Sequence, residues 1–518
     1  MKLLTAAQSR ELDRLSQEKY GIVSYVLMTN AGEAVARAAI EKFRARVSEA
    51  VLVVAGKGNN GGDGMVTARK LHQDGVKVRA ILLGKASALK GDAARAHADF
   101  ISAGGAVTEV ETDAALDAIM RGRSGIVIDA IFGTGLNAEV SGLPRGAIEK
   151  ISALKVPVVA VDIASGINSD TGAVMGAAIE ASLTVTFGFA KFGHVSYPGA
   201  GHCGELKVVE IGFAPEAIDE IAPKGIFLEA KDVHGWMTPR TDNSHKGMFG
   251  HVMVIAGSRG KAGAALLSSR GALRAGAGLV TAAIPNCVGD VVSSGQAELM
   301  TEAIADRDGH FDGRAATEAL SSLIKPMSSI VVGPGIGVSD GTEDLIAWLI
   351  EEAVQPDRPM LIDADGLNVL AQIGPAKLKD AKGPVVVTPH PGEMSRLLGI
   401  GTREVNVDRI SAAKKLAGLS GAVVLLKGAR SVIAAPSGEV YINSTGNPGM
   451  STPGMGDALS GMAGAFLAQR MDALRALALG VFLHGCAADR VAARYGRVGY
   501  IVGDLLDELP RAMDTLVY

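Results

Sequence analysis

The sequence predicts an α/β protein of two domains, each with a mostly parallel sheet covered by helices on both faces. Near-continuous apolar runs alternate with helical patterns along the chain, as in buried parallel strands joined by crossover helices. Two glycine-rich loops of different design, Val51–Gly64 and Gly446–Gly461, lie far apart in the chain. The 518 residues also exceed the roughly 250–300 at which a single core stops growing. Two domains, each with its own anion-binding loop, are therefore expected.

The first half contains apolar runs that predict five buried strands: Val51–Ala55, Val76–Leu83, Gly125–Ile131, Val156–Val161 and Leu183–Phe187. Helical patterns fall between most of them: Asp63–Gln73, Asp92–Ala103 and Ala114–Met120. The join to the second half is expected between about Ala214 and Pro239, where prolines interrupt short mixed segments.

The second half repeats the alternation. Its predicted strands are His251–Ala256, Leu279–Ile284, Ile330–Val332, Met360–Asp363, Val385–Thr388 and Ala422–Lys427. Its predicted helices are Ala264–Ala275, Glu343–Ala353, Glu393–Leu398, Asp408–Leu416 and Asp457–Gln469. The apolar stretch Leu474–Ala493 contains four charged or titratable residues, so it predicts a buried helix rather than a membrane span.

Composition narrows the class of partner. With a formal net charge of −4, the chain has no excess of positive charge that would attract nucleic acid or an anionic membrane. Neither partner is expected. Cys203, Cys287 and Cys486 lack metal-ligand spacing, which favours reduced thiols in a cytoplasmic protein. Charged residues follow the first apolar patch at once, from Arg10 to Arg14, so no signal peptide is expected.

The first glycine loop follows a predicted strand and leads into a predicted helix. The loop contains five glycines, which can adopt backbone turns that residues with a Cβ disfavour: Gly56, Gly58, Gly61, Gly62 and Gly64. Asp63 stands where the helix is expected to begin, and the free amides there suit a phosphate. Asn59 and Asn60 add side-chain carbonyls that suit a ribose, an amide or a hard cation. The alternative is a purely structural turn.

Two more strand ends in the first half carry polar residues. Asp129 lies in a predicted strand that leads into the loop Phe132–Leu136, and Asp162 directly follows another strand. Ligands of open α/β sheets bind beyond the carboxyl ends of strands, so these loops are expected to converge on one crevice. Asp162 is a candidate general acid or base, and its alternative role is capping or a hydrogen bond to its loop. Lys191 could lie at the same rim, although a lone lysine is usually solvated.

The first half resembles the NAD(P)H-hydrate epimerase domain over roughly residues 1–215. The match rests on LMTNAGEAVA, GNNGGDG, DAIFGTGL, DIASGINSDTG and the TFG run that leads to Lys191. The resemblance implies a Rossmann-like three-layer α/β/α fold and interconversion of the two C6 epimers of hydrated NADH or NADPH (NADHX, NADPHX). It makes Asp162 the residue nearest the chemistry.

The resemblance also assigns ligands in this half. The hydrate would be held by Asn59, Asn60, Gly61, Gly62, Asp63, Gly133, Thr134, Gly135, Leu136, Asn137, Ala138, Glu139, Asp162 and Lys191. A potassium ion would be held by Asn60, Asp129 and Ser165, whose oxygens suit a hard cation.

The second glycine loop has the features of a ribokinase-like site for phosphoryl transfer. Backbone amides of Gly454–Gly456 could stabilise a transferring phosphoryl group, and Asp457 could accept a proton from an attacking hydroxyl. Lys427 ends a predicted strand and could meet a nucleotide phosphate, and His390 follows another strand end. The alternatives are an N-capping aspartate and a turn histidine.

The second half resembles the ADP/ATP-dependent NAD(P)H-hydrate dehydratase, a ribokinase-like α/β domain, over roughly residues 230–510. The match rests on six strings that occur in the family's order: SHKGMFGHVMVIAGS, GPGIG, DADGLN, TPHPGEMSRL, LLKGARS and GNPGMSTPGMGDALSG. The resemblance implies hydrate contacts at Ala264, Gly337, His390 and Asp457, with Asp457 as base. It implies nucleotide contacts at Lys427, Gly428, Ala429, Arg430, Ser431 and Gly456.

The combined expectation is a metabolite-repair enzyme. One half equilibrates the epimers, and the other phosphorylates the S epimer with ADP or ATP and Mg²⁺ and eliminates phosphate. Members of the family are commonly multimeric, which implies a homo-oligomer. Pro453 replaces a usual glycine and removes one amide donor at the loop entrance. The competing hypotheses are a vitamin or sugar kinase fused to a nucleotide-binding module, and a nucleotide-sensing or scaffold protein without turnover.

Overall fold

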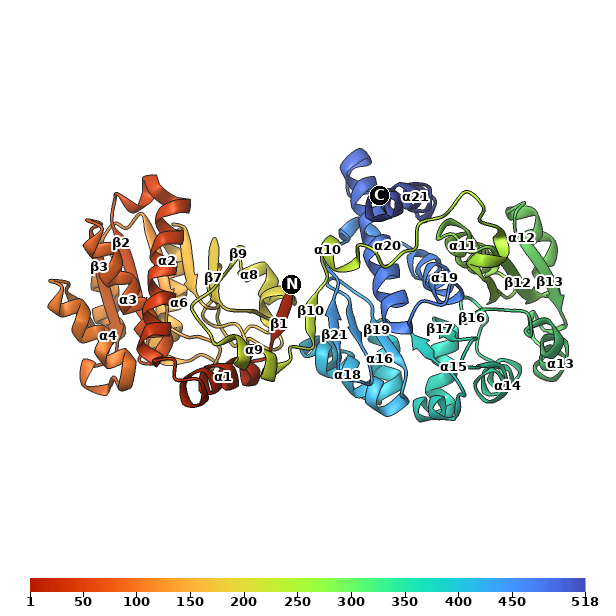
Figure 1. The fold of residues 1–518 in the computed structure, drawn as a ribbon, viewed down its shortest axis with the longest axis horizontal. Helices are drawn as coiled ribbons and strands as arrows, with labels where there is room; N and C mark the ends of the chain where they lie inside the picture. The colour runs from red at the N-terminus through yellow and green to blue at the C-terminus, as the bar shows by residue number, and fades with distance from the viewer. Residues whose placement is uncertain (518) are drawn as a thin grey trace. The chain divides into compact units, whose positions relative to one another are not determined.

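A computed structural model gives the structure of the protein and describes residues 1–517. The chain divides into two compact units, an N-terminal unit of Lys2–Gly225 and a C-terminal unit from Ile226 onward. The boundary lies inside the proline-interrupted segment between Ala214 and Pro239. Each unit has its own sheet and its own helices, as Figure 1 shows.

The N-terminal unit is built on a seven-stranded sheet in the order β4-β3-β2-β5-β6-β7-β9, in which every pair is parallel. Its strands are β2 (Val51–Ala55), β3 (Val78–Leu83), β4 (Val107–Val110), β5 (Ile126–Ala130), β6 (Val158–Val161), β7 (Leu183–Phe187) and β9 (Glu205–Val209). A short parallel pair joins β1 (Lys2–Leu4) to β8 (Ala190–Lys191). Its helices are α1 (Ala6–Arg14), α2 (Ser24–Val47), α3 (Asn59–Gln73), α4 (Gly91–Ser102), α5 (Asp113–Met120), α6 (Gly142–Ala153), α7 (Phe192–Val195), α8 (Gly199–His202) and α9 (Pro215–Ile221).

Residue alternation along β2 explains why both faces of this sheet are covered. Val51 and Val53 pack with residues of α2, α3 and α4, whereas Leu52 and Val54 pack with residues of α5 and α6. All of β2 is buried. The predicted three-layer α/β/α arrangement of this half is therefore confirmed.

The C-terminal unit contains a larger sheet whose strands follow the order β13-β12-β11-β16-β17-β18-β19-β20-β21. The strands from β13 to β19 are parallel, and β20 and β21 add antiparallel edges. Their bounds are β11 (His251–Ile255), β12 (Leu279–Pro285), β13 (Met300–Ile304), β16 (Ser329–Val332), β17 (Met360–Ile362), β18 (Val385–Val387), β19 (Val423–Leu426), β20 (Val432–Ala434) and β21 (Val440–Ile442). Strand β10 (Gly225–Phe227) crosses the boundary between the units, and β14 (Asp306–Arg307) pairs with β15 (His310–Phe311).

Helices cover both faces of this sheet as well. The core on one face joins strand residues to α11, α19, α20 and α21, and Figure 1 shows α13 to α16 and α18 along the other face. The helices of this unit are α10 (Ala230–Val233), α11 (Ala262–Arg274), α12 (Gly289–Gly295), α13 (Gly313–Leu323), α14 (Asp340–Trp348), α15 (Asp365–Ile373), α16 (Pro391–Leu398), α17 (Thr402–Val407), α18 (Arg409–Ser420), α19 (Met455–Ala468), α20 (Ala473–Tyr495) and α21 (Val502–Val517).

Helix α20 corresponds to the predicted buried helix. By length and composition it is the one helix in the described part of the chain that could cross a membrane, yet most of its apolar window is buried. Its side chains contribute to the core beside α19 and α21. Burial within the fold accounts for the apolar character of this stretch.

Candidate active sites

The N-terminal unit has a cavity of about 860 Å³ at the point where its strand order reverses. The chain proceeds from β2 outward through β3 and β4, and then returns to β5 on the other side of β2. Loops that leave β2 and β5 in opposite directions open a crevice between them, which is the usual ligand site of such sheets. The predicted ligand residues that line the cavity are Asn59, Asn60, Asp63, Gly133, Thr134, Gly135, Leu136, Asn137, Ala138, Glu139, Asp162 and Lys191.

Gly61 and Gly62, also predicted ligands, are not among the residues that line this cavity. A Cβ on Gly61 would lie 1.9 Å from the carbonyl oxygen of Gly56, and a Cβ on Gly62 would lie 2.8 Å from the Met28 side chain. Helix α3 begins at Asn59 rather than Asp63, so these glycines lie inside its first turns. None of the motif's glycines has a positive φ. They permit close packing instead of the turns that the sequence suggested.

Asp162 lies in a buried polar network directly after β6. Lys191 Nζ donates to Asp162 Oδ1 over 2.7 Å, and the Thr186 hydroxyl donates to the same oxygen over 2.8 Å. Burial opposes ionisation, but the Lys191 charge and these hydrogen bonds together hold the pKa of Asp162 below its usual value. Asp162 has a φ of 63°, a left-handed conformation that is costly for a residue with a Cβ and is often found at active sites.

His194 fixes the backbone of this network. Its Nδ1 accepts from the backbone N–H of Lys191 over 2.9 Å, so Nε2 carries the proton and donates to the Asp162 carbonyl oxygen over 2.9 Å. Burial lowers the pKa of His194 to about 4, so the ring stays neutral. His194 therefore orients both members of the ion pair. The sequence reasoning missed it because its spacing from Asp162 carries no motif.

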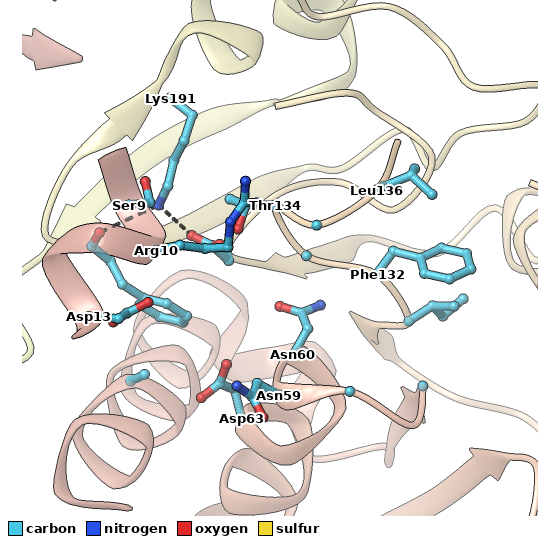
Figure 2. Close-up of a pocket in the computed structure, with 18 of the residues that line it drawn as sticks. Ser9, Arg10, Asp13, Asn59, Asn60, Asp63, Phe132, Thr134, Leu136 and Lys191 are labelled. Atoms are coloured by element: carbon cyan, nitrogen blue, oxygen red, sulfur yellow. Dashed lines mark hydrogen bonds and ion pairs between the residues drawn. The ribbon is translucent and has the colours of Figure 1, made fainter. Parts of the chain in front are cut away.

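Helix α1 contributes side chains that no motif indicated. Ser9, Arg10, Asp13 and Gln17, at or just after α1, line the cavity, and Figure 2 shows Asp13 across from Asp63 and Asn60 of α3. Burial, with repulsion from Asp162, raises the pKa of Asp13 to about 6. Burial, with repulsion from Asp162 and Asp13, raises the pKa of Asp63 well above its usual value. Three aspartate carboxyl groups thus line the cavity, in addition to the exposed Glu139.

Two of the three residues predicted to hold potassium, Asp129 and Ser165, are in contact beside this cavity. Ser165 donates to Asp129 through its hydroxyl over 2.6 Å and through its backbone N–H over 2.8 Å. Asn60 Oδ1 lies 3.2 Å from where a Cβ on Gly133 would be. Asp129 is fully buried and has no ion-pair partner among the described residues, and burial raises its pKa to about 6. A buried carboxylate without a counter-charge, among oxygen donors, fits a monovalent cation.

The C-terminal unit has a second cavity, of about 430 Å³, again where the strand order reverses, between β11 and β16. Predicted ligands Ala264 and Asp457 line it together with Lys261, Asp365 and Pro453. Lys261 Nζ donates to Asp365 Oδ2 over 2.8 Å, and the Gly337 N–H donates to the same oxygen over 3.0 Å. Gly337 therefore positions a carboxylate of the cavity wall. Asp365 and Lys261 were not predicted.

The N-terminus of α19 opens at this cavity without a side-chain cap. Gly454 precedes the helix with a φ of 87°, and its carbonyl accepts from the N–H of Ala458. The amides of Met455, Gly456 and Asp457 are the unpaired donors that such a helix start presents to an anion. A Cβ on Gly456 would lie 3.2 Å from Lys427 Nζ, so a lysine stands beside the same helix start.

Lys427 is paired with a carboxylate that sequence reasoning did not single out. Its Nζ donates to Asp363 Oδ1 over 2.7 Å, and the Ser460 hydroxyl of α19 donates to Asp363 Oδ2 over 2.6 Å. Burial opposes the charge of Asp363, but Lys427 and these hydrogen bonds hold its pKa below the usual value. Within residues 1–517, Asp457 has no cation paired with its carboxylate. Burial and repulsion from Asp363 raise the pKa of Asp457 to about 7.

His390 caps α16 and does not line the second cavity. Its Nδ1 accepts from the backbone N–H of Gly392 over 3.0 Å, and the backbone N–H of His390 donates to Glu393 Oε2 over 2.7 Å. Burial and the nearby Lys427 charge lower the pKa of His390. Burial raises the pKa of Glu393 to about 7.

The predicted nucleotide loop after β19 is held mostly by its own contacts. The Ser431 hydroxyl donates to the Gly428 carbonyl over 2.9 Å. Arg430 donates to the Ser444 carbonyl over 2.6 Å and lies over the ring of Phe227. Arg409, which was not predicted, donates to the carbonyls of Leu426 and Lys427 over 3.0 and 3.1 Å. These contacts hold the loop against the end of β19 and the Ser444 backbone.

Comparison with known proteins agrees with the resemblance of both halves. Residues 252–511 match the family described as NAD(P)H-hydrate dehydratase, and residues 24–193 match the family described as YjeF-related protein N-terminus. The bifunctional NAD(P)H-hydrate repair enzyme Nnr of Moorella thermoacetica is 39% identical over 100% of this chain and 97% of its own length. That of Thermofilum pendens is 37% identical over 100% of this chain and 97% of its own.

A solved structure supports the C-terminal fold. An ADP/ATP-dependent NAD(P)H-hydrate dehydratase from Bacillus subtilis, co-crystallised with ATP and Mg²⁺, is 28% identical with a TM-score of 0.50. It covers 56% of this chain and 98% of its own. The predicted ribokinase-like α/β class of the second half is confirmed, as is the resemblance stated from the motifs. The chain belongs to the family of bifunctional NAD(P)H-hydrate repair enzymes.

Proposed function

We propose that this chain repairs hydrated NADH and NADPH in two steps. The N-terminal unit interconverts the C6 epimers of the hydrate, and the C-terminal unit converts the S epimer back to NAD(P)H with ADP or ATP. The observation that carries the proposal is the pairing of Asp457 with an open helix N-terminus at the wall of the second cavity. That arrangement suits transfer of a phosphoryl group to a hydroxyl.

In the C-terminal unit, Asp457 takes the proton of the C6 hydroxyl as that oxygen attacks the terminal phosphorus. A new O–P bond forms, the bond to the leaving nucleotide breaks, and the α19 amides and Lys427 stabilise the charge on the phosphoryl oxygens. Phosphate then leaves C6 with its bonding electrons, and loss of a neighbouring ring proton restores the double bond of NAD(P)H. We assign hydrate contacts to Ala264, Gly337, His390 and Asp457, and nucleotide contacts to Gly456 and to residues 427–431.

Mg²⁺ would arrive with the nucleotide phosphates in this proposal. No group of three or more His, Cys, Asp or Glu side chains within residues 1–517 could hold a metal alone. Mg²⁺ typically keeps several waters and binds through one or two carboxylates together with substrate phosphates. The carboxylates nearest the open helix start are Asp363 and Asp457.

In the N-terminal unit, the ionised Asp162 accepts a proton during epimerisation while Lys191 and Thr186 hold its carboxylate in place. The nicotinamide end of the hydrate would lie against Asp162, with the loops Asn59–Asp63 and Gly133–Glu139 around it. Potassium, held by Asn60, Asp129 and Ser165, would neutralise the buried Asp129 charge and fix the ends of β5 and the Ser165 loop. We also propose that the protein is cytoplasmic and that it forms a homo-oligomer. Size-exclusion chromatography with light scattering would test the oligomeric state.

The decisive variant for the C-terminal proposal is Asp457→Asn. We expect nucleotide-dependent conversion of the purified S epimer to fall by about 100-fold or more, because the general base is lost. Wild-type activity should fall as pH drops through about 7, because Asp457 is a base only when ionised and burial raises its pKa to that value. The exposed Asp340→Asn on α14 is the matched control. Unchanged turnover by Asp457→Asn would remove Asp457 from the mechanism.

A further inference from the structure

The N-terminal cavity contains more carboxyl groups than it can hold ionised. Asp13 of α1, Asp63 of α3 and Asp162 after β6 all line it, and the buried cation among them, Lys191, is paired with Asp162 alone. Three buried carboxyl groups with one of them paired to an ammonium disfavour full ionisation, because burial and like charges at short range raise the pKa of the other two. The proposed reaction has so far used only Asp162.

Lys191 has no donor left for Asp13 or Asp63. Its three N–H groups are directed to Asp162 Oδ1 at 2.7 Å, to Thr186 Oγ1 at 2.8 Å and to the Phe187 carbonyl at 3.5 Å. Asp13 has neither a hydrogen bond nor an ion pair with any described residue, although its side chain lines the cavity. A polar group in such a position is available to a ligand.

Other cavity-wall atoms also lack partners. The Ser9 hydroxyl, one turn before Asp13 on α1, is buried without a hydrogen-bond partner among the described residues, and so is the Asn60 side-chain nitrogen. Buried polar atoms rarely stay unpaired, so these two indicate a polar ligand against the same wall. Figure 2 shows Ser9 and Asp13 on α1 facing the cavity opposite Asn60 and Asp63.

Resting on the proposed epimerase function, we propose that Asp13 is a second catalytic residue of this site, which works with Asp162 as an acid–base pair. The Asp13 carboxyl gives its proton to the C6 hydroxyl, the C6–O bond breaks with its electrons on oxygen, and water forms. The lone pair of ring N1 forms a double bond to C6. Water then attacks C6 on its other face and gives a proton to the Asp162 carboxylate. Exchange with solvent returns that proton to Asp13, so no net proton, electron or atom is consumed.

Two carboxyl groups on separate elements suit this reaction, because epimerisation has to serve both faces of C6. Asp162 is paired with Lys191 and stays ionised, so it can accept a proton. Asp13 is unpaired, and burial raises its pKa to about 6, so it can both give up and regain a proton near neutral pH. Burial, with repulsion from Asp162 and Asp13, also raises the pKa of Asp63 well above its usual value, so this wall of the cavity disfavours a further negative charge.

The test uses the full-length protein and separated R and S epimers, with chromatography as the readout. Asp13→Asn keeps the shape of the protonated carboxyl but cannot give up a proton, and we expect it to slow epimerisation by about 100-fold or more. Asp13→Glu should recover part of the rate. Glu11→Gln, on the same helix but paired with Arg14 at the surface, is the matched control and should epimerise at the wild-type rate. Nucleotide-dependent dehydration of the S epimer should be unchanged in all three variants and reports that the protein is folded.

A pH profile separates catalysis from a structural role. The charged groups that face Asp13 are Arg10 on its own helix, Asp63 from α3, and Asp162 with Lys191 from the sheet side. The active form has Asp13 protonated and Asp162 ionised. Wild-type epimerisation, corrected for the uncatalysed rate, should therefore decline as pH rises through about 6. Asp13→Asn should lack this decline.

The outcomes separate the two proposals. If wild-type protein does not epimerise the hydrate, the proposed function of this unit fails whatever the variants do. If wild-type protein epimerises it and Asp13→Asn keeps the wild-type rate, only the role of Asp13 is wrong. A slow Asp13→Asn variant that retains the decline near pH 6 would also overturn the role, because the titrating group would then be another.

Discussion

At the scale of single residues, two aspartates show how their surroundings set the pKa of a carboxyl group in each unit. Asp162 has an ammonium partner 2.7 Å away and remains ionised. Asp457 has no ion-pair partner among the described residues and feels the charge of Asp363, so burial raises its pKa to about 7. An aspartate is therefore ionised before reaction in one site and titrates near neutral pH in the other.

Replacing Asp162 tests its chemistry, provided that stability is controlled. Asp162→Asn would leave the buried Lys191 charge without its partner, which typically costs about 3–5 kcal/mol of unfolding free energy. The double variant Asp162→Asn with Lys191→Met removes both charges and should regain much of that loss, while epimerisation stays absent. Thermal unfolding and chromatographic epimer analysis would measure the two effects. Epimerisation by the stable double variant would contradict the role of Asp162.

At the residue level, the motifs indicated which loops reach the cavities but not every residue that lines them, since His390 and Gly337 do not line the second cavity. The motif residues Asp162, Lys191 and Asp457 all line the predicted cavities. Asp13 and Asp363 were missed, because what matters is the buried charge each one faces from a distant part of the chain. Such pairings depend on the folded structure, and a lone aspartate in a helix or at a strand end carries no signal for them.

At the scale of elements, the second site depends on the close approach of α11 and α19. A Cβ on Gly461 of α19 would lie 1.8 Å from the carbonyl oxygen of Ser268 on α11. A Cβ on Gly271 of α11 would lie 2.3 Å from the carbonyl oxygen of Ala458. The Ser268 hydroxyl also donates to the Asp457 carbonyl over 2.8 Å. This contact holds the start of α19, and with it Asp457, against the cavity wall.

Gly461→Ala should therefore impair both stability and activity. We expect overpacking to cost about 1–3 kcal/mol of unfolding free energy and to displace α19, so dehydration should fall further than the loss of folded protein explains. Gly503→Ala on α21 is the control, because a Cβ there meets nothing within 4 Å. It should leave activity intact and raise stability by about 0.4–1 kcal/mol. Denaturant unfolding with activity assays would check both, and equal behaviour of the two variants would contradict the packing argument.

Among the elements, buried strands were the easiest to predict. Val51–Ala55 and Leu183–Phe187 match β2 and β7 residue for residue. Strands β4 and β9 were missed, because they lie at the edges of the sheet and carry exposed polar residues such as Glu109 and Glu205. Helix α3 begins four residues earlier than expected, since the glycine-rich motif itself adopts the first helical turn.

At the scale of the whole molecule, each cavity is lined by residues of one unit only. The length of the chain and its two unlike glycine loops were enough to predict two sites. The products of the first site are free hydrates, which can diffuse to any C-terminal unit. Nothing in the proposed chemistry requires both reactions to occur in the same molecule.

Mixing two inactive variants tests this independence. Protein with the Asp162→Asn and Lys191→Met substitutions can dehydrate but not epimerise, and Asp457→Asn can epimerise but not dehydrate. We expect an equimolar mixture to restore full conversion of the R epimer, at a rate that depends on enzyme concentration. Each variant alone should fail with the R epimer beyond its spontaneous epimerisation. A mixture that fails would show that the sites must be joined in one chain.

The most direct test of the account is the recovery of reduced-nicotinamide absorbance from a mixed-epimer hydrate with Mg²⁺, compared among ADP, ATP and no nucleotide. We predict complete, nucleotide-dependent recovery, since one unit supplies the epimer that the other consumes. If the absorbance stops rising near the fraction of hydrate present as one epimer, the epimerase function would be contradicted, while the dehydratase function would still stand. No recovery with either nucleotide would contradict the repair function and favour a ribokinase-type kinase of vitamins or sugars.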